Sequence, residues 1–340
     1  MVTRSDAPAL LDIMTRHQVY LEGYKAYQAR QFDRVIQAMR VELRGLFFDL
    51  EFDQLSDMTR RELDKFIRRL RTAQLQHFNS YTQQVLNDLR AFMEVDTKLH
   101  ADIMQETQEE DKQALAALLA SLTKKHLKTL WAKLNGTVLP ATGMTPEEYL
   151  NSFTQSSLSA IETSVMMSYA NKFTPSQALR NIIGTVGYNG RDGVMNRFSA
   201  QASGLTATLI QHASSIAQEA TVTKYFSRYM WSSIIDSVTT SICRARNGLV
   251  YLFGLGPLPP AHPFCRSKIV PVADTAIEVP TYYQWIKRQP ALFQDDVLPL
   301  RIASGLRDGT VNSANLPKFG SISSLTLEEF KGKLNLILAT

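Results

Sequence analysis

Two cysteines and one histidine are the side chains of this chain whose types and spacing could do chemistry. Cys243 and Cys265 are separated by a Gly- and Pro-rich segment, and His262 stands three residues before Cys265. Thiolate and imidazole groups bind zinc, a thiol beside an imidazole can act as a nucleophile, and two thiols can form a disulfide. The segment between the cysteines, ending in GPLPPAHPF, predicts turns rather than a regular element.

Nucleophilic catalysis is the alternative that the sequence supports least. A catalytic Cys265 needs a base within reach, and Pro263 disfavours a helical conformation for His262. The sequence marks no acid–base partner, no Ser/His/Asp triad, no HExxH motif and no P-loop. We therefore predict that the chain is not an enzyme, and a toxin-like or nuclease activity is only a third alternative.

Zinc binding, a disulfide and simple packing remain open for the two cysteines. Cys243, His262 and Cys265 supply three donors where a structural zinc site has four, although Asp236 or another histidine could complete the set. A Cys243–Cys265 disulfide would close a loop of about two dozen residues and stabilise the fold by about 3 kcal/mol. We favour two reduced, packed cysteines in a loop whose glycines and prolines fix its path, with no cofactor.

Long helices are predicted to precede this region. Residues 8–50 and 58–134 have helical patterns, and no Gly or Pro interrupts the chain between Asp57 and Gly136. The apolar stripe of the second segment has a 3.6-residue period: Leu63, Phe66, Ile67, Leu70, Phe78, Tyr81, Val85, Leu89 and Phe92. A Gly/Pro/Thr-rich linker near 136–145 then divides the chain into a helical arm, 1–140, and a mixed domain, 141–340. The predicted class is α+β and predominantly helical, with few strands.

Three Thr-x-x-Glu/Gln patterns predict helix starts in the second region. They stand at Thr145 with Glu148, at Thr174 with Gln177 and at Thr326 with Glu329. The first two have Pro at the first helical position. The Gly-rich segment 182–195 lacks the spacing of a P-loop or a dinucleotide fingerprint, so we predict a turn between two helices there.

The charge balance permits contact with nucleic acid without requiring it. The 340 residues carry a formal net charge of +5, and 20% of them are charged. A basic run on the second predicted helix contains six positive side chains: Arg60, Arg61, Lys65, Arg68, Arg69 and Arg71. Such a run is more often a solvated helix face than a site for DNA or an acidic partner. We also expect no signal peptide, no membrane span and synthesis in a cytoplasm.

In the order of its motifs the chain resembles the phage Mu F-like minor head, or head morphogenesis, proteins. The segment DSVTTSICRARNGLVY at 236–251 is followed by a Gly/Pro-rich spacer and by PPAHPFCRSKIVPV at 259–272. The segments 282–311 and 325–330 continue the likeness, which covers roughly the last 200 residues. Further similar segments lie upstream, at 14–25, 173–185 and 191–217.

The resemblance implies a virion component that acts in head assembly at the portal vertex or in the capsid interior. Its partners would be the portal protein, the major capsid protein or both, with several copies assembled in the host cytoplasm. Some relatives also affect genome packaging or exit, so the alternative is a DNA-contacting internal protein involved in genome packaging or ejection. Some relatives carry a CxxC pair and an HPxCxC pair, a fuller set of zinc ligands. Here Cys243 lacks its partner and Ser267 stands at the last cysteine position, which favours a loop held by packing, hydrogen bonds or one disulfide.

The motif core, 231–311, is expected to have a structural role. Its motif residues are Asp236, Thr240, Cys243, Gly248, Tyr251, His262, Pro263, Cys265 and Arg266. Asp236 and Thr240 are suited to turn and cap hydrogen bonds. The five-donor fork of Arg266 suits a clamp on carbonyls or a carboxylate of the same fold. The aromatic residues Trp231, Tyr251 and Trp285 are expected in the core.

Overall fold

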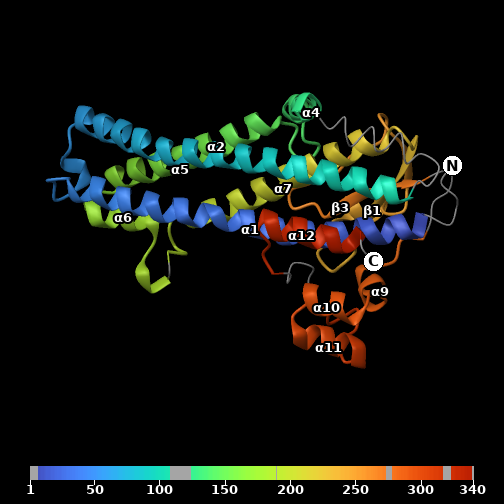
Figure 1. The fold of residues 1–340 in the computed structure, drawn as a ribbon. Coiled ribbons are helices and arrows are strands. Elements are labelled where there is room, and N and C mark those ends of the chain that lie inside the picture. Colours follow the sequence, from blue (N-terminus) through green and yellow to red (C-terminus); the bar gives the residue numbers. More distant parts are fainter. Residues whose placement is uncertain (1–6, 108–123, 189, 273–277, 317–322, 339–340) are drawn as a thin grey trace. The chain divides into compact units, whose positions relative to one another are not determined.

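The computed structural model describes residues 7–107, 124–188, 190–272, 278–316 and 323–338, and these residues are mainly helical (Figure 1). The α-helices are α1 (Ala7–Phe48), α2 (Arg60–Thr107), α4 (Lys124–Gly136), α5 (Pro146–Ala170), α6 (Pro175–Ile183), α7 (Asn196–Val222), α8 (Ser241–Arg246), α9 (Tyr282–Lys287), α10 (Ala291–Val297), α11 (Leu300–Asp308) and α12 (Leu327–Leu338). The strands are β1 (Arg228–Ser233), β2 (Val250–Leu252) and β3 (Ser267–Val272). The predicted class, predominantly helical α+β with long N-terminal helices and few strands, is confirmed. None of the helices in these ranges has both the length and the apolar character of a membrane span.

The helix starts follow the capping patterns of the sequence. The Thr174 hydroxyl accepts a hydrogen bond from the Gln177 N–H, and the Gln177 side chain accepts one from the Thr174 N–H. Thr326 and Glu329 make the same reciprocal pair at the start of α12. Two orphan N–H groups are thereby satisfied at each helix end, and α5 begins at Pro146 as predicted. The predicted helix over 58–134 corresponds to α2 and α4, and its part at 108–123 lies outside the described residues.

The described residues form two compact units that are interleaved along the sequence. The first comprises residues 1–27, 89–146 and 207–340, and the second comprises 28–88 and 147–206. This grouping differs from the predicted division at residue 140. The physical reason is that α1, α2 and α7 each contribute residues to both units. The predicted linker near 136–145 ends at one limit between the units, between Pro146 and Glu147, but three further limits fall within α1, α2 and α7.

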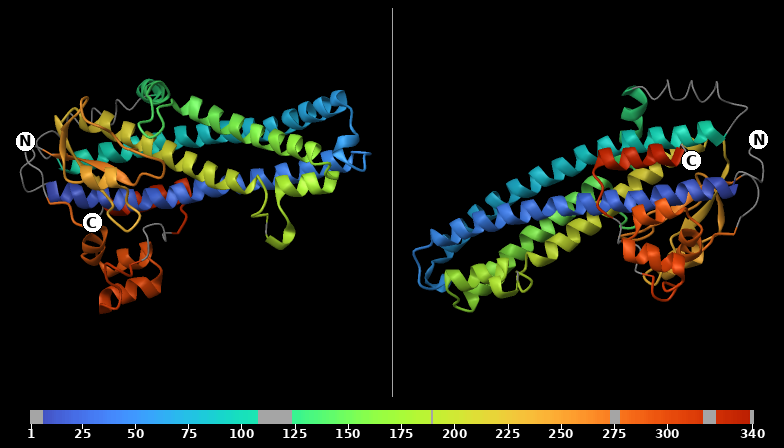
Figure 2. Two further views of the ribbon diagram at one scale, coloured as in Figure 1. Left: turned by 180° about the vertical axis from the view of Figure 1, so that it is seen from behind. Right: turned by 60° about the horizontal axis from the view of Figure 1, so that its bottom comes forward.

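The first unit has an aromatic core made by α1, α2 and α12 (Figures 1 and 2). Tyr24 of α1 stacks on Phe92 of α2 with a centroid distance of 5.1 Å. Phe330 of α12 lies 5.8 Å from each of these rings. The Leu325 N–H donates to the Gly23 carbonyl at 3.0 Å, which fixes the chain just before α12 against α1. The burial of three aromatic rings makes this a major source of stability for the unit.

The small sheet of the first unit is antiparallel, with strand order β2-β1-β3. Ser233 at the end of β1 pairs with Ser267 at the start of β3, and Trp231 pairs with Ile269. Every residue of β3 is buried. Gln218 of α7 donates to the Ile269 carbonyl at 2.7 Å, so a helix side chain satisfies a backbone group of β3. This pairing brings together the two residues that flank the connection 234–266.

The second unit is organised around a separate aromatic cluster. Phe153 of α5 lies 5.5 Å from Phe32 of α1 and 5.7 Å from Phe78 of α2, measured between ring centroids. Phe32 also meets Tyr81 edge to face at 4.6 Å. These rings come from the apolar stripes of helices that are far apart in the sequence. Edge-to-face pairs of this kind each add about 0.5–1.5 kcal/mol beyond the area that they bury.

The Gly-rich segment 182–195 is a turn between α6 and α7, as predicted. Gly184 adopts the left-handed region with φ 79° and ends α6. Asp192 accepts hydrogen bonds from the N–H and the hydroxyl of Thr185 at 2.8 and 2.9 Å. A Cβ on Gly193 would lie 2.2 Å from the backbone N of Gly184, whereas a Cβ on Gly187 would meet no atom within 4 Å. Gly193 thus allows a close approach of two backbone segments, whereas Gly187 has free space around it.

We predict opposite tolerance at these two glycines. Gly193→Ala should lower the free energy of unfolding of the second unit by about 1–3 kcal/mol, because the added methyl cannot be accommodated without moving backbone. Gly187→Ala, the matched control in the same loop, should change it by less than about 0.5 kcal/mol. Urea denaturation of both variants measures the difference. Equal effects would show that the loop geometry is not as described.

Candidate functional site

The motif residues lie in the connection between β1 and β3 of the first unit. Cys243 is carried by α8, whose six residues follow a tight turn after β1. His262 and Cys265 lie in the loop that leads into β3, and the Cys265 N–H donates to the His262 carbonyl at 3.1 Å. Phe264 between them has φ 58°, in the left-handed region. Because Ser233 pairs with Ser267, α8 and this loop come together at one end of the sheet.

Cys243, His262 and Cys265 form a compact group of three donors. The Cys243 Sγ lies 3.1 Å from His262 Nε2 and 3.8 Å from Cys265 Sγ. All three donor atoms lie within 4.8 Å of one another. The sulfur separation is far longer than the about 2.05 Å of a disulfide, and both cysteines are free. The cysteines are therefore packed thiols in this structure, and the disulfide of the sequence interpretation is not formed.

Hydrogen bonding and burial give the two thiols different pKa values. Their mutual hydrogen bond raises the pKa of Cys243 and lowers that of Cys265 well below its usual value. The hydrogen bond between the two sulfurs, which lie 3.8 Å apart, therefore makes the two thiols unequal in acidity. The backbone of Ala261 and both the backbone and side chain of Ser267 also donate toward Cys265 and lower its pKa. The core around the two thiols is completed by Trp231, whose indole ring is fully buried.

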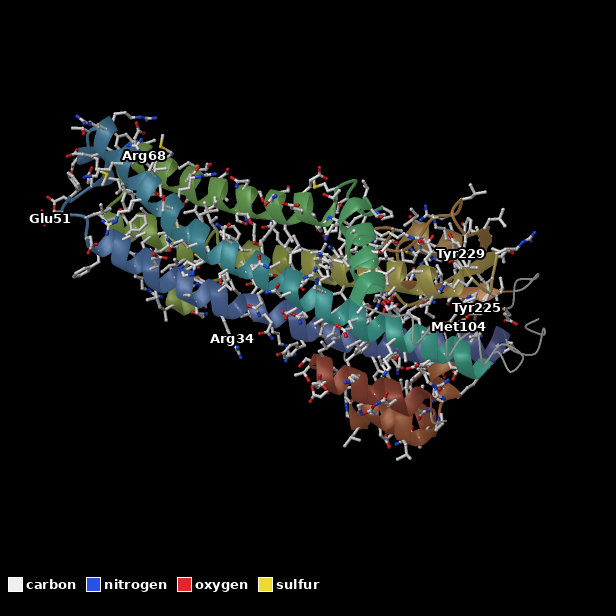
Figure 3. The ribbon with its side chains drawn as sticks, turned by 45° about the horizontal axis from the view of Figure 1, so that its top comes forward. Arg34, Glu51, Arg68, Met104, Tyr225 and Tyr229 are labelled. Carbon is white, nitrogen blue, oxygen red and sulfur yellow. The ribbon has the colours of Figure 1, made fainter. Side chains whose placement is uncertain are left out.

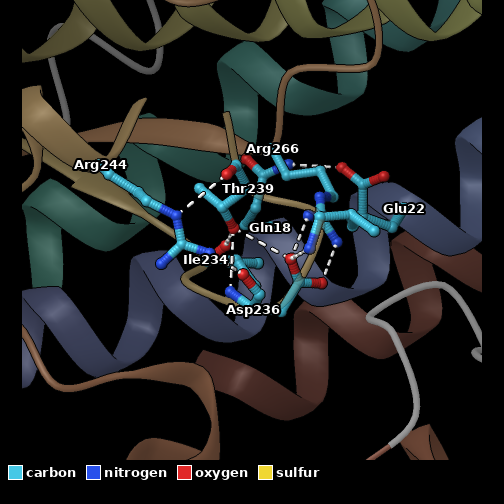
Figure 4. A network of polar contacts seen from close by, with 8 residues as sticks. Gln18, Glu22, Ile234, Asp236, Thr239, Arg244 and Arg266 are labelled. Atoms are coloured by element: carbon cyan, nitrogen blue, oxygen red, sulfur yellow. Dashed lines mark hydrogen bonds and ion pairs between the residues drawn. The ribbon is translucent and has the colours of Figure 1, made fainter. Parts of the chain in front are cut away.

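Arg266 binds Asp236 through both oxygens of its carboxylate (Figure 4). The two guanidinium nitrogens each lie 2.7 Å from a carboxylate oxygen, and both side chains are almost buried. This is the carboxylate clamp predicted for Arg266, with its partner now identified. Asp236 also accepts from the Val238 N–H at 3.1 Å, in the turn that precedes α8. The prediction of turn hydrogen bonds for Asp236 is thus confirmed.

The turn between β1 and α8 is braced by two further side chains (Figure 4). The Thr239 hydroxyl accepts from the Asp236 N–H at 2.9 Å and donates to the Ile234 carbonyl at 2.9 Å. Arg244 of α8 reaches back to the carbonyls of Thr239, at 3.0 Å, and of Asp236. Side chains thus satisfy several backbone groups of the turn, as buried or half-buried polar groups require.

A buried lysine of α1 connects the motif to the helices of the same unit. The Lys25 ammonium donates to Glu22 at 2.7 Å, to Gln211 of α7 at 2.5 Å and to the Cys265 carbonyl at 3.3 Å. Its three N–H donors are therefore matched by three acceptors. Gln18, one turn earlier on α1, also donates to Glu22, at 2.8 Å (Figure 4). The sequence interpretation missed Lys25 and Gln211, because no local spacing marks a contact of this range.

Among the remaining motif residues, Tyr251 and Thr240 depart from the prediction. Gly248 has φ 84°, and its N–H donates to the Trp231 carbonyl at 2.9 Å. Tyr251 of β2 is half-buried, whereas Trp231 and Trp285 are in the core. Thr240 is the N-cap residue of α8, but its side chain makes no cap hydrogen bond. Instead its buried hydroxyl hydrogen-bonds the Cys243 side chain of the same helix.

A pocket of about 330 Å³ adjoins the three donors. Cys243 and His262 line it, together with Thr240, Ser267 and Glu22. Its walls therefore combine two of the donors with hydroxyl and carboxylate groups. The pocket gives small polar molecules or ions a route to Cys243 and His262, whereas Cys265 is fully buried.

The basic residues of α2 divide into paired and unpaired side chains. Arg60, Arg69 and Arg71 lie 3.5, 3.1 and 2.6 Å from carboxylate oxygens of the second unit. Arg61, Lys65 and Arg68 are exposed and have no ion pair within the described parts of the chain (Arg68 is labelled in Figure 3). Their spacing of four and three residues places them on one helix face. Half of the predicted basic run thus remains available to an acidic partner.

A second donor cluster, which the sequence interpretation missed, lies in the core of the first unit. His17 Nε2 lies 2.6 Å from one oxygen of Asp96, and His100 Nε2 lies 3.4 Å from the other. Burial lowers the pKa of His17, while the two histidines outweigh the effect of burial on Asp96 and keep its pKa below the usual range. The i, i+4 spacing of Asp96 and His100 was the available signal. All three side chains are buried, so they form a polar group packed in the core of the first unit.

No protein-family model, curated protein or solved structure matches this chain. The resemblance to Mu F-like head proteins therefore remains an expectation from the motif residues. Function has to be inferred from the way in which those residues are assembled.

Breaking the Arg266–Asp236 pair should destabilise the first unit strongly. Arg266→Lys keeps the charge but removes the bidentate fork, so we expect a loss of about 1.5–3 kcal/mol in the free energy of unfolding, the worth of one hydrogen bond to a charged group. The control is Arg307→Lys, because Arg307 pairs with Asp295 at 2.8 Å at an exposed site. The control should lose less than about 1 kcal/mol. Thermal and urea unfolding of both variants test this, and equal losses would contradict a special role for the clamp.

Proposed function

We propose that this chain is a structural component of a tailed-phage head, acting in head assembly at the portal vertex or in the capsid interior. The observation that carries the proposal is the assembly of the motif residues into one braced module. Asp236, Arg266 and the Cys/His/Cys group come from separate segments of the motif and meet around the β1–α8 turn. The residues that carry the family resemblance are thus the residues that hold this module together.

The surface of the same module offers a contact area for a partner protein. Six large apolar side chains that are at least 40% exposed fall within residues 238–264: Val238, Ile242, Leu249, Leu252, Leu255 and Phe264. Where exposed apolar side chains form one patch, such a patch is typical of protein–protein contact sites. Portal or major capsid subunits are the partners that the resemblance implies. In this proposal the buried polar contacts of the motif hold the shape of the loop, and the exposed apolar side chains within residues 238–264 contact the partner protein.

The proposal is tested by the composition of phage particles and by one pair of variants. Mass spectrometry of purified virions and procapsids should detect the chain. Leu255→Glu, at a side chain 83% exposed, should reduce its incorporation at least tenfold because it places a charge in the contact area. Leu292→Glu, at a side chain 86% exposed outside residues 238–264, should be incorporated normally. Absence of the chain from both particle types would overturn the proposal.

Contact with packaged DNA is a second candidate function, favoured by the unpaired face of α2. Arg61, Lys65 and Arg68 present three positive charges on one helix face without carboxylate partners in the described ranges. Such a row can follow a phosphate backbone, and its affinity would fall as salt rises. This role is compatible with a position inside the head, where packaging or ejection brings DNA past internal proteins.

Measuring the binding of duplex DNA at several salt concentrations tests whether this face of α2 contacts DNA or is only solvated. Replacing Arg61, Lys65 and Arg68 by Gln should remove about 2–3 units from the slope of log K against log salt. Replacing Arg60, Arg69 and Arg71 by Gln removes the same formal charge from residues already in ion pairs, and should change the slope less. Undetectable binding of the unmodified chain at low salt would eliminate the DNA role.

A further inference from the structure

We infer that Cys243, His262 and Cys265 bind one zinc ion, with a fourth coordination position open to the adjoining pocket. This goes beyond the proposed function and does not rest on it. From the sequence, three donors spread over 23 residues favoured packed thiols over a metal. The structure adds the spacing, orientation and surroundings of the donors, and each of these suits zinc.

The spacing of the donors matches tetrahedral coordination. Two thiolates bound to zinc at about 2.3 Å and at the tetrahedral angle lie about 3.8 Å apart, and the two sulfurs here are separated by 3.8 Å. His262 Nε2 lies 3.1 Å from Cys243 Sγ, so a shift of a few tenths of an ångström completes a three-donor set. The donor atoms converge on one point instead of forming a disulfide or separate hydrogen bonds to distant groups.

The imidazole of His262 is oriented as a metal ligand. Its Nδ1 lies 2.7 Å from the Pro263 carbonyl, which can only accept, so the proton is on Nδ1. Nε2 then carries a lone pair, and it is the nitrogen that faces Cys243. Metal-bound histidines typically donate their other ring nitrogen to a carbonyl or carboxylate in this way. Pro263, a residue of the motif, therefore sets the tautomer.

Hydrogen-bond donors surround the sulfur atoms and suit thiolates. The backbone of Ala261 and the backbone and hydroxyl of Ser267 donate toward Cys265. Ser267 stands two residues after Cys265 and also hydrogen-bonds Cys243. Donors of this kind stabilise metal-bound thiolates and orient them. Zinc binding would release the thiol protons to solvent and leave the metal and both sulfurs in their oxidation states.

The fourth position is open because the pocket begins at the donors. Cys243 and His262 line a space of about 330 Å³ that also contains the hydroxyls of Thr240 and Ser267. The Thr240 hydroxyl hydrogen-bonds Cys243, so it adds a donor beside that sulfur at the mouth of the pocket. Three protein ligands with an accessible position are the arrangement that keeps zinc exchangeable toward exogenous ligands.

Metal content of the purified full chain tests the inference directly. We expect one zinc per chain by plasma mass spectrometry, and a cobalt-substituted protein with the absorption of tetrahedral cobalt and a sulfur-to-cobalt charge-transfer band. Loss of a group that only hydrogen-bonds a metal ligand weakens binding by about 10–100-fold. His262→Gln removes a ligand itself, so it should weaken zinc binding by more than this. His77→Gln, at a half-exposed histidine paired with Glu42, is the control and should retain the metal. Cys265→Ser should weaken the charge-transfer band, because only the Cys243 thiolate is left to contribute to it, with folding checked by circular dichroism.

Two outcomes would overturn the inference. Equal zinc binding by the unmodified chain, His262→Gln and Cys265→Ser would show that these residues are not the ligands. Failure of the folded chain to bind zinc or cobalt would show that there is no site. Azide added to the cobalt protein should shift its spectrum, and an unchanged spectrum would exclude the open position. The zinc and cobalt measurements do not depend on the composition of phage particles. A negative result for zinc can therefore be distinguished from a negative result for the proposed head function.

Discussion

The ion pair between Arg266 and Asp236 is the interaction on which the motif depends. It joins the turn after β1 to the residue just before β3, across a connection of 30 residues that contains little regular structure. A fork of two hydrogen bonds fixes angle as well as distance, which a single lysine contact cannot do. Both partners are nearly buried, so neither tolerates the loss of the other.

Neighbouring contacts turn this one clamp into a defined site. Cys265 is adjacent to Arg266, and its carbonyl is held by the buried Lys25 ammonium. Cys243 is placed by α8, whose approach is set by the turn that Asp236 and Thr239 brace. Buried ion pairs often add little net stability, but they select one arrangement among several of similar packing energy. In this motif that selection places two sulfurs and one imidazole nitrogen within 4.8 Å of one another.

Local features of the fold could be predicted from the sequence, and long-range pairings could not. Thr174 with Gln177 and Thr326 with Glu329 start helices because a capping box acts within four residues. The fork of Arg266 indicated a carboxylate, but nothing local identified Asp236 as its partner. The His17–Asp96 contact joins residues 79 positions apart, and only the folded helices bring them together. The interleaved units have the same origin, since long helices distribute neighbouring residues between two cores.

The choice among the chemical alternatives for the cysteines also depends on distance. A disulfide would require the sulfurs to approach by nearly half of their 3.8 Å separation, against α8 on one side and β3 on the other. A nucleophilic Cys265 would require substrate to reach a sulfur that is fully buried. A metal requires neither movement, because the present separation of the sulfurs is already that of two zinc ligands. The Gly/Pro loop therefore has a chemical reason for its path: it delivers His262 and Cys265 to Cys243 without bringing the two sulfurs into bond contact.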